Sequence, residues 1–191
     1  MNDKMKNVLS FKTETSGLPL WRARSNDEGQ PHIVRLAAVL CDGKTQRVID
    51  QMDVVIRPDG WVIPQETIDI HGVTNERALE EGISEAEAVE MFLKLFTGSV
   101  RVSSNKQFNN RIIRIALKRF GTEEQQELWH DKEDNFCAMK MAEYDLGNKS
   151  ITLPEATAHY LGHKPVDNSN SFVNAEAAAM IYFAINNKLG A

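Results

Sequence analysis

Three segments rich in branched apolar residues follow one another near the start of the chain. They are residues 8–14, 33–41 and 47–56, and the last two flank the short polar segment Asp-Gly-Lys-Thr at residues 42–45. Branched side chains favour β-strands, and a short Gly-containing link between two such runs favours an antiparallel hairpin. We therefore expect the chain to open with three strands, of which the second and third form a hairpin.

Helical patterns dominate the rest of the chain. Residues 84–96 begin with Ser-x-x-Glu, which is typical of a helix start, and residues 106–120 repeat apolar residues at helical spacing before Gly121. The other expected helices are residues 64–70, 123–129, 153–161 and 172–189, and residues 100–102 suit a short strand. This order predicts an α/β fold with a mixed sheet rather than a purely parallel one. Because no linker or repeat interrupts residues 1–191, we expect a single domain.

The formal net charge of −5 excludes a protein that is basic throughout, so binding of nucleic acid would need a local basic patch. One basic run offers such a patch, although a solvated helix face is the favoured interpretation. Its members are Arg111, Arg114, Lys118 and Arg119. Trp21, which Arg22 and Arg24 flank, could stack on a base, but an anchor that packs the loop of residues 15–31 is favoured.

Nothing in the chain predicts a membrane segment or a signal peptide. The longest apolar run, residues 177–185, is far shorter than the roughly 20 residues that span a bilayer. Cys41 and Cys137 form no CxxC pattern and are expected to be reduced, buried thiols in a cytoplasmic protein. His159 and His163 have the spacing of a helical metal pair, but Gly162 intervenes, and surface positions are expected for both.

Four short blocks carry residue types typical of an active site. They are residues 11–19 (Phe-Lys-Thr-Glu-Thr-Ser-Gly-Leu-Pro), 70–74 (Ile-His-Gly-Val-Thr), 102–109 (Val-Ser-Ser-Asn-Lys-Gln-Phe-Asn) and 169–177 (Ser-Asn-Ser-Phe-Val-Asn-Ala-Glu-Ala). In this order the blocks resemble the motifs of the DEDDh (DnaQ-like) 3′→5′ exonucleases. Each block alone is weakly specific, but together they extend over most of the chain. The resemblance implies an RNase H-like fold, with a central mixed sheet of about five strands flanked by helices.

The resemblance also implies a particular chemistry. Active relatives hold two Mg²⁺ or Mn²⁺ ions with four carboxylates, because such cations prefer oxygen ligands, and a histidine deprotonates the attacking water. At the corresponding positions of this chain only Glu14 is retained. Lys12, Asn109 and Asn174 stand where the family has Asp, and Ser169 stands where it has the general-base His.

Each replacement removes charge or proton-accepting ability. An asparagine lacks the negative charge that binds a cation, and a serine hydroxyl is too weak a base near neutral pH. The ammonium of Lys12 could pair with Glu14 and occupy the space of one metal. We therefore expect no cofactor in this form, with Glu14 as a remnant metal ligand. The favoured hypothesis is a catalytically inactive domain, either a natural pseudoenzyme or an active-site variant.

The resemblance places substrate-binding residues at five further positions. They are Thr15, Leu18, His71, Asn105 and Phe108. For His71 a structural hydrogen-bonding role is favoured over a ligand role. The implied partner is the 3′ end of a single strand, bound weakly. Two other functions stay open, namely a non-cleaving single-strand-binding module and residual exonuclease activity. The sequence leaves open whether the relatives act on DNA or RNA, and which oligomeric state the protein adopts.

Overall fold

The computed structural model describes residues 6–96, 98–130, 133–163 and 170–189. One five-stranded sheet forms its centre, in the strand order β3-β2-β1-β4-β5. The strands are β1 (Val8–Thr15), β2 (Ile33–Cys41), β3 (Val48–Val55), β4 (Val100–Ser103) and β5 (Asn135–Cys137). Strand β2 pairs antiparallel with β1 and β3, whereas β4 pairs parallel with β1 and β5. The expected mixed sheet and the β2–β3 hairpin are confirmed.

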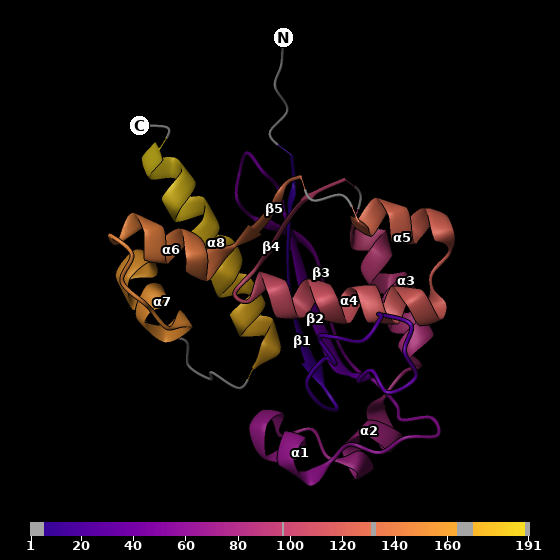
Figure 1. Ribbon diagram of the computed structural model, residues 1–191. Coiled ribbons are helices and arrows are strands. Elements are labelled where there is room, and N and C mark those ends of the chain that lie inside the picture. The colour runs from indigo at the N-terminus through magenta and orange to yellow at the C-terminus, as the bar shows by residue number, and fades with distance from the viewer. Residues whose placement is uncertain (1–5, 97, 131–132, 164–169, 190–191) are drawn as a thin grey trace.

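Helices cover both faces of this sheet (Figure 1). They are α1 (Gln65–His71), α2 (Asn75–Glu81), α3 (Glu85–Leu95), α4 (Lys106–Phe120), α5 (Glu123–His130), α6 (Ala138–Asp145), α7 (Leu153–Leu161) and α8 (Ser171–Leu189). Helices α3, α4 and α5 lie on one face, and α6, α7 and α8 lie on the other. Helices α1 and α2 lie beyond the end of the sheet at which β1 terminates. This layered α/β arrangement fits an RNase H-like fold.

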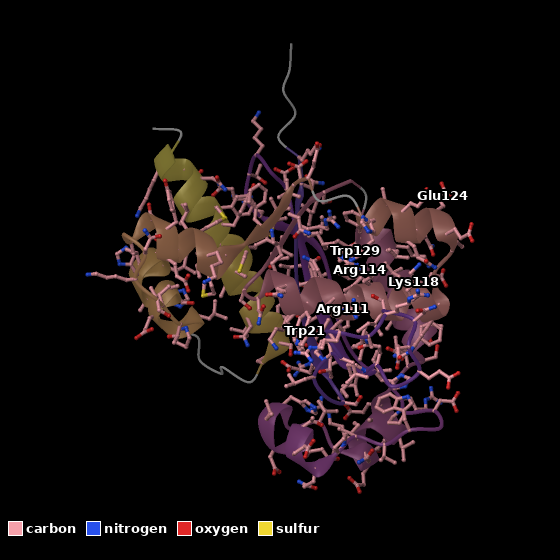
Figure 2. All side chains as sticks on the ribbon, viewed as in Figure 1. Trp21, Arg111, Arg114, Lys118, Glu124 and Trp129 are labelled. Carbon is pink, nitrogen blue, oxygen red and sulfur yellow. The ribbon has the colours of Figure 1, made fainter. Side chains whose placement is uncertain are left out.

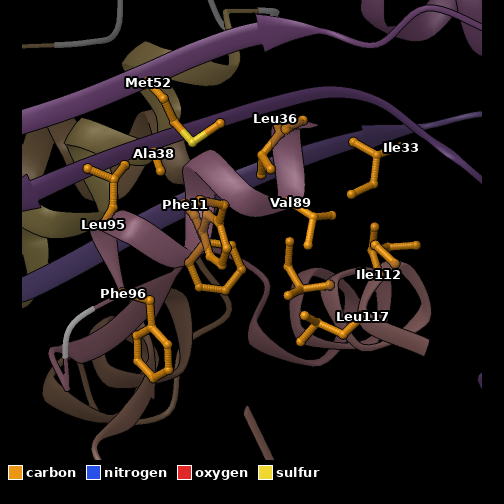
Figure 3. Close-up of a cluster of buried hydrophobic side chains, with 14 of the residues drawn as sticks. Phe11, Ile33, Leu36, Ala38, Met52, Val89, Leu95, Phe96, Ile112 and Leu117 are labelled. Atoms are coloured by element: carbon orange, nitrogen blue, oxygen red, sulfur yellow. The ribbon is translucent and has the colours of Figure 1, made fainter. Parts of the chain in front are cut away.

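Strand alternation divides the core into two clusters. Leu9 and Phe11 point toward α3 and α4, where the Phe11 ring packs edge-on against Phe92 and Trp129 at centroid distances of 5.2 and 5.6 Å. Figure 3 shows Phe11 inside this cluster of buried apolar side chains. Val8 points the other way and belongs to the cluster beneath α6, α7 and α8. Because successive side chains of a strand point to opposite faces, Lys12 and Glu14 lie on the α8 face with Val8.

Three elements were not expected from the sequence. Helix α2 buries only Ala78 and depends on its cap, in which the Thr74 side chain accepts a hydrogen bond from the Arg77 main chain. Strand β5 has 3 residues and exists through its pairing with β4. Helix α6 buries two alanines, which leave a faint apolar pattern. In contrast, Ser84 caps α3 as expected, and Gly72 ends α1 in the left-handed conformation (φ 72°).

The remaining sequence expectations have mixed outcomes. Cys41 is buried and Cys137 is only half-buried, and both thiols are free. His159 and His163 are exposed, as expected. Within the described residues, no helix is long and apolar enough to cross a membrane.

Candidate functional site

Several of the sequence-predicted residues lie close together where β1 ends. The N-terminal ends of α4 and α8 reach this point from opposite faces of the sheet, and His71 lies at the C-terminal end of α1. Lys12 and Glu14 come from β1, whereas Asn109 and Asn174 lie in the first turns of α4 and α8. The fold therefore brings together residues that the four sequence blocks place far apart.

Lys12 and Glu14 form a direct ion pair. The ammonium nitrogen of Lys12 lies 2.6 Å from Oε1 of Glu14, and the two side chains keep 23% and 14% of their surface exposed. The ammonium also donates a hydrogen bond to the main-chain oxygen of Thr13 at 3.3 Å. Positions i and i+2 of a strand lie on one face, so the pairing follows from local geometry. The expected Lys12–Glu14 pair is present.

Helix α8 supplies a second partner for the same carboxylate. The buried Ser171 hydroxyl donates to Oε1 of Glu14 at 2.9 Å. The neighbouring cation, Arg35, lies opposite Glu14 on β2 and forms a two-bond pair with Asp53 at 2.8 and 2.7 Å. The charge of Glu14 is thus balanced by the Lys12 ammonium, and its Oε1 also accepts the Ser171 hydrogen bond. The charge of Arg35 is balanced by Asp53.

Asn109 acts as a structural clamp between α4 and β1. Its Oδ1 accepts two hydrogen bonds from Thr13, one from the main-chain N–H and one from the hydroxyl, both at 2.9 Å. Its Nδ2 donates to the main-chain oxygen of Asn105 at 3.0 Å. The side chain is 1% exposed. A carboxylate at this position would lack the amide donor, so this bond network suits asparagine in particular.

His71 is buried within electrostatic reach of the Lys12–Glu14 pair. Its Nδ1 accepts a hydrogen bond from the Val73 main-chain N–H at 3.1 Å. Burial lowers the pKa of His71 most strongly, the charge of Lys12 lowers it further, and Glu14 and the Thr15 main chain oppose this shift. The neutral imidazole is therefore favoured. The bond to Val73 agrees with a structural role, and the closeness to Glu14 puts the ring beside the site.

The other predicted positions differ in accessibility. Thr15 is buried and donates from its hydroxyl to the Gly17 oxygen at 2.7 Å, whereas the Leu18 side chain is 77% exposed. Asn105 caps α4 by accepting from the Phe108 N–H at 3.3 Å, and Phe108 packs partly buried against the core. Asn174 is buried in the first turn of α8. Ser169 lies outside the described residues.

The site residues that the structure describes do not fit a pair of divalent metals. Among the described residues, no group of three or more His, Cys, Asp or Glu side chains is arranged to hold a metal ion. The oxygen of Glu14 that faces Lys12 is shared by an ammonium and a hydroxyl, and Oδ1 of Asn109 is occupied by two protein donors. Mg²⁺ and Mn²⁺ need several anionic oxygens that are open to the ion.

The basic run of α4 does not form one solvated face. Arg111 donates to the Leu20 and Ala23 oxygens and to the Ser25 hydroxyl, at 3.3, 2.6 and 2.9 Å. Arg119 binds the main-chain oxygens of Gln30 and Pro31. These two arginines therefore hold the loop that follows β1, which sequence patterns did not predict. Trp21 in this loop is 50% exposed, and its role as an anchor that packs the loop or as a stacking surface stays a prediction.

The chain is similar to known proteins in sequence and in fold. A family described as RNase_T, exonuclease, matches residues 11–164. A search of curated proteins found no match.

Solved structures of exonuclease I resemble the whole described chain. A structure of exonuclease I that suggests how processivity is achieved has a TM-score of 0.73 at 18% identity over 95% of this chain. E. coli exonuclease I in complex with a dT13 oligonucleotide has a TM-score of 0.72 at 19% identity over 96% of it. A complex of exonuclease I with SSB-Ct has a TM-score of 0.73 at 17% identity over 97% of this chain. The chain spans 41–42% of the length of these proteins. At these identities the likeness establishes the fold.

Proposed function

The chain belongs to the RNase_T exonuclease family, and from this premise we propose that it is a catalytically inactive member, which does not hydrolyse phosphodiester bonds with divalent metals. The observation that carries the proposal is the Lys12–Glu14 ion pair at 2.6 Å. It stands at the end of β1, where the family resemblance places a carboxylate pair for metal.

The charge balance of the site supports inactivity. Two-metal hydrolysis needs anionic ligands that offset the charge of both ions. Here the ammonium of Lys12 cancels the charge of Glu14, and Asn109 contributes an uncharged oxygen. At a separation of 4 Å, two unit charges near a protein surface interact by about 4 kcal/mol, so a divalent ion beside Lys12 would be strongly repelled. To enter, the ion would have to displace the ammonium from a half-buried position.

For the ligand of this site we propose the 3′ end of a single-stranded nucleic acid, held weakly and not cut. Relatives of the same fold were crystallised with dT13 and dA16 oligonucleotides. The fold that surrounds the end of β1 is retained, but the positive charge of Lys12 is already used by Glu14. We further propose that residues 1–191 act as one domain and that the protein is cytoplasmic, in keeping with the family match and the free cysteines.

Restoration of the family residues tests the proposal. The present chain and the variant Lys12→Asp/Asn109→Asp/Ser169→His/Asn174→Asp are incubated with 5′-labelled single-stranded DNA and RNA in Mn²⁺. We expect the restored variant alone to shorten the strands from the 3′ end, and EDTA to abolish this activity. The variant Asn109→Asp/Asn174→Asp, which keeps Lys12, serves as the matched control and is expected to stay inactive.

Cleavage by the present chain at the rate of the restored variant would contradict the proposal. It would show that residual exonuclease activity, rather than inactivity, is the function of this site. Filter binding of labelled strands by the present chain in EDTA tests the ligand separately. Affinity that does not fall as salt concentration rises would contradict binding through phosphate contacts.

A further inference from the structure

A concave pocket of about 380 Å³ lies on the outer side of α4, apart from the Lys12–Glu14 pair. The loop after β1, α4, the end of α5 and the start of β5 form its walls. The lining residues are Trp21, Lys106, Gln107, Asn110, Arg111, Arg114, Trp129, His130 and Asn135. Figure 2 shows Trp21, Arg111, Arg114 and Trp129 gathered on the side of the molecule that carries α4 and α5.

The described part of the lining is basic and includes no carboxylate. It includes Lys106, Arg111, Arg114 and His130, although the chain as a whole has a net charge of −5. Among the described residues, Arg111 binds neutral acceptors alone, namely two main-chain oxygens and a hydroxyl, and none of these cancels its charge. Its pKa is lowered by burial and by the charge of Arg114. Two like charges held side by side form a favourable place for an anion.

Arg114 is the cation that is available to a ligand. Its side chain lines the pocket, and its Nε is buried without a hydrogen-bond partner among the described residues, so a ligand would meet the terminal Nη groups. No described carboxylate lies within ion-pair distance of its side chain, whereas Arg35 and Arg77 in the same chain are paired with acidic residues. A guanidinium fork binds phosphate oxygens through two parallel N–H donors, so phosphate is the anion that fits its geometry best.

An aromatic surface lies in the same pocket. The Trp21 indole is 50% exposed, and Trp129 forms a buried wall whose N–H donates to the Asn110 oxygen at 3.3 Å. An exposed indole beside unpaired cations is typical of sites that stack a nucleobase and bind its phosphate. The volume lies at the small end of the range for ligand sites, which suits one nucleotide better than a long segment.

We propose that this pocket binds a nucleoside monophosphate, either free or as the terminal nucleotide of a strand, with its phosphate on Arg114 and its base against Trp21. This site goes beyond the proposed function, because it shares no residue with the Lys12–Glu14 site and requires neither metal nor cleavage. An acidic peptide would satisfy the cations, but the exposed indole favours a planar base.

Calorimetric titration of the full chain with dAMP, in EDTA and low salt, tests the proposal. We expect saturable binding that Arg114→Gln weakens at least tenfold. The matched control, Lys140→Gln, removes the same charge from α6 on the other face of the sheet and is expected to change the affinity less than twofold (Figure 1). Trp21→Ala is expected to reduce the affinity for dAMP to that for inorganic phosphate.

Three further titrations identify the source of the ligand. They use inorganic phosphate, a short oligonucleotide with a terminal phosphate, and an acidic peptide. Tighter binding of the phosphorylated oligonucleotide than of dAMP assigns the site to strand ends, and the reverse assigns it to free nucleotides; both support the proposal. It is overturned if dAMP does not bind at millimolar concentration, if phosphate binds as tightly as dAMP, if the peptide binds more tightly than either nucleotide, or if Lys140→Gln weakens binding as much as Arg114→Gln.

Discussion

The ammonium of Lys12 lies 2.6 Å from Oε1 of Glu14, two residues further along β1 on the same face of the sheet. The same oxygen accepts a hydrogen bond from the Ser171 hydroxyl at 2.9 Å. The charges of this site are therefore balanced by the protein itself. Stability and metal response should depend on this arrangement, and both can be measured without knowledge of a substrate.

Lys12→Met is expected to lower the free energy of unfolding by about 1–3 kcal/mol, because Glu14 would lose its cation in a mostly buried position and keep Ser171 as its hydrogen-bond donor among the described side chains. Urea unfolding at pH 7 measures this change. In the double variant Lys12→Met/Glu14→Gln no charge remains unpaired, so we expect it to be more stable than Lys12→Met alone. If the separate effects of Lys12→Met and Glu14→Gln on the free energy of unfolding add up to that of the double variant within about 0.5 kcal/mol, the pair does not couple in solution.

The thermal midpoint of the present chain is expected to be the same in EDTA and in about 10 mM Mg²⁺, because a protein that does not bind the ion gains no stability from it. The variant Lys12→Asp/Asn109→Asp/Asn174→Asp should gain stability on Mg²⁺ addition. At a hundredfold excess over the dissociation constant the gain would be about 2.7 kcal/mol. A clear rise in the thermal midpoint of the present chain on Mg²⁺ addition would contradict the assignment of Glu14 as a remnant ligand that no longer holds a metal.

Asn109→Asp is expected to destabilise the fold by about 1–3 kcal/mol at neutral pH, because the donor to the Asn105 oxygen is replaced by a carboxylate oxygen in a buried position. A protonated Asp could still donate, so the folded state should raise the pKa of this carboxyl. Stability would then be highest below the unfolded-state pKa and would fall as pH rises through the folded-state pKa.

Asn186→Asp provides the control for this substitution. Asn186 also donates from Nδ2 to the oxygen four residues earlier, that of Tyr182, but its side chain is exposed. A carboxylate there stays hydrated, so the loss should be within about 0.5 kcal/mol. Urea unfolding at pH 4 and pH 7 measures both variants. If Asn109→Asp and Asn186→Asp lose the same free energy of unfolding, the burial of Asn109 does not cause the destabilisation.

His71 should make stability depend on pH in a window below its ordinary pKa. Burial lowers the pKa of His71 in the folded protein from its ordinary 6.5, so the unfolded chain binds the proton more readily. The stability that neutral His71 contributes is fully present above pH 6.5 and is lost as pH falls through the folded-state pKa. Urea unfolding between pH 5 and pH 7.5 measures the slope of the unfolding free energy against pH.

His71→Asn is expected to flatten that slope, since asparagine retains an acceptor for the Val73 N–H but does not titrate. The control His159→Asn removes an exposed imidazole from α7 and should leave the slope as it is in the present chain. An unchanged slope in His71→Asn would assign the pH dependence to other groups.

Much of the fold could be predicted because local patterns encode it. The branched residues of β1, β2 and β3, the apolar spacing of α3 and α4, and the glycine after α1 all act over a few residues. Strand β5 could not be predicted in this way, because 3 residues become a strand only through the hydrogen bonds that β4 supplies. Helix α6 was missed because its buried residues are alanines.

The sequence by itself determined the family and the chemical character of the site, since residue identity and order along the chain carry both. It also determined the Lys12–Glu14 pair, which strand alternation makes a local contact. Only the tertiary structure decided that Asn109 binds Thr13, 96 residues away, and that Arg111 holds the loop after β1. It also decided that Arg114 lines the pocket with Trp21, without an ion-pair partner in the described part of the chain. Polar side chains have many acceptable partners, and packing over long sequence distances selects among them.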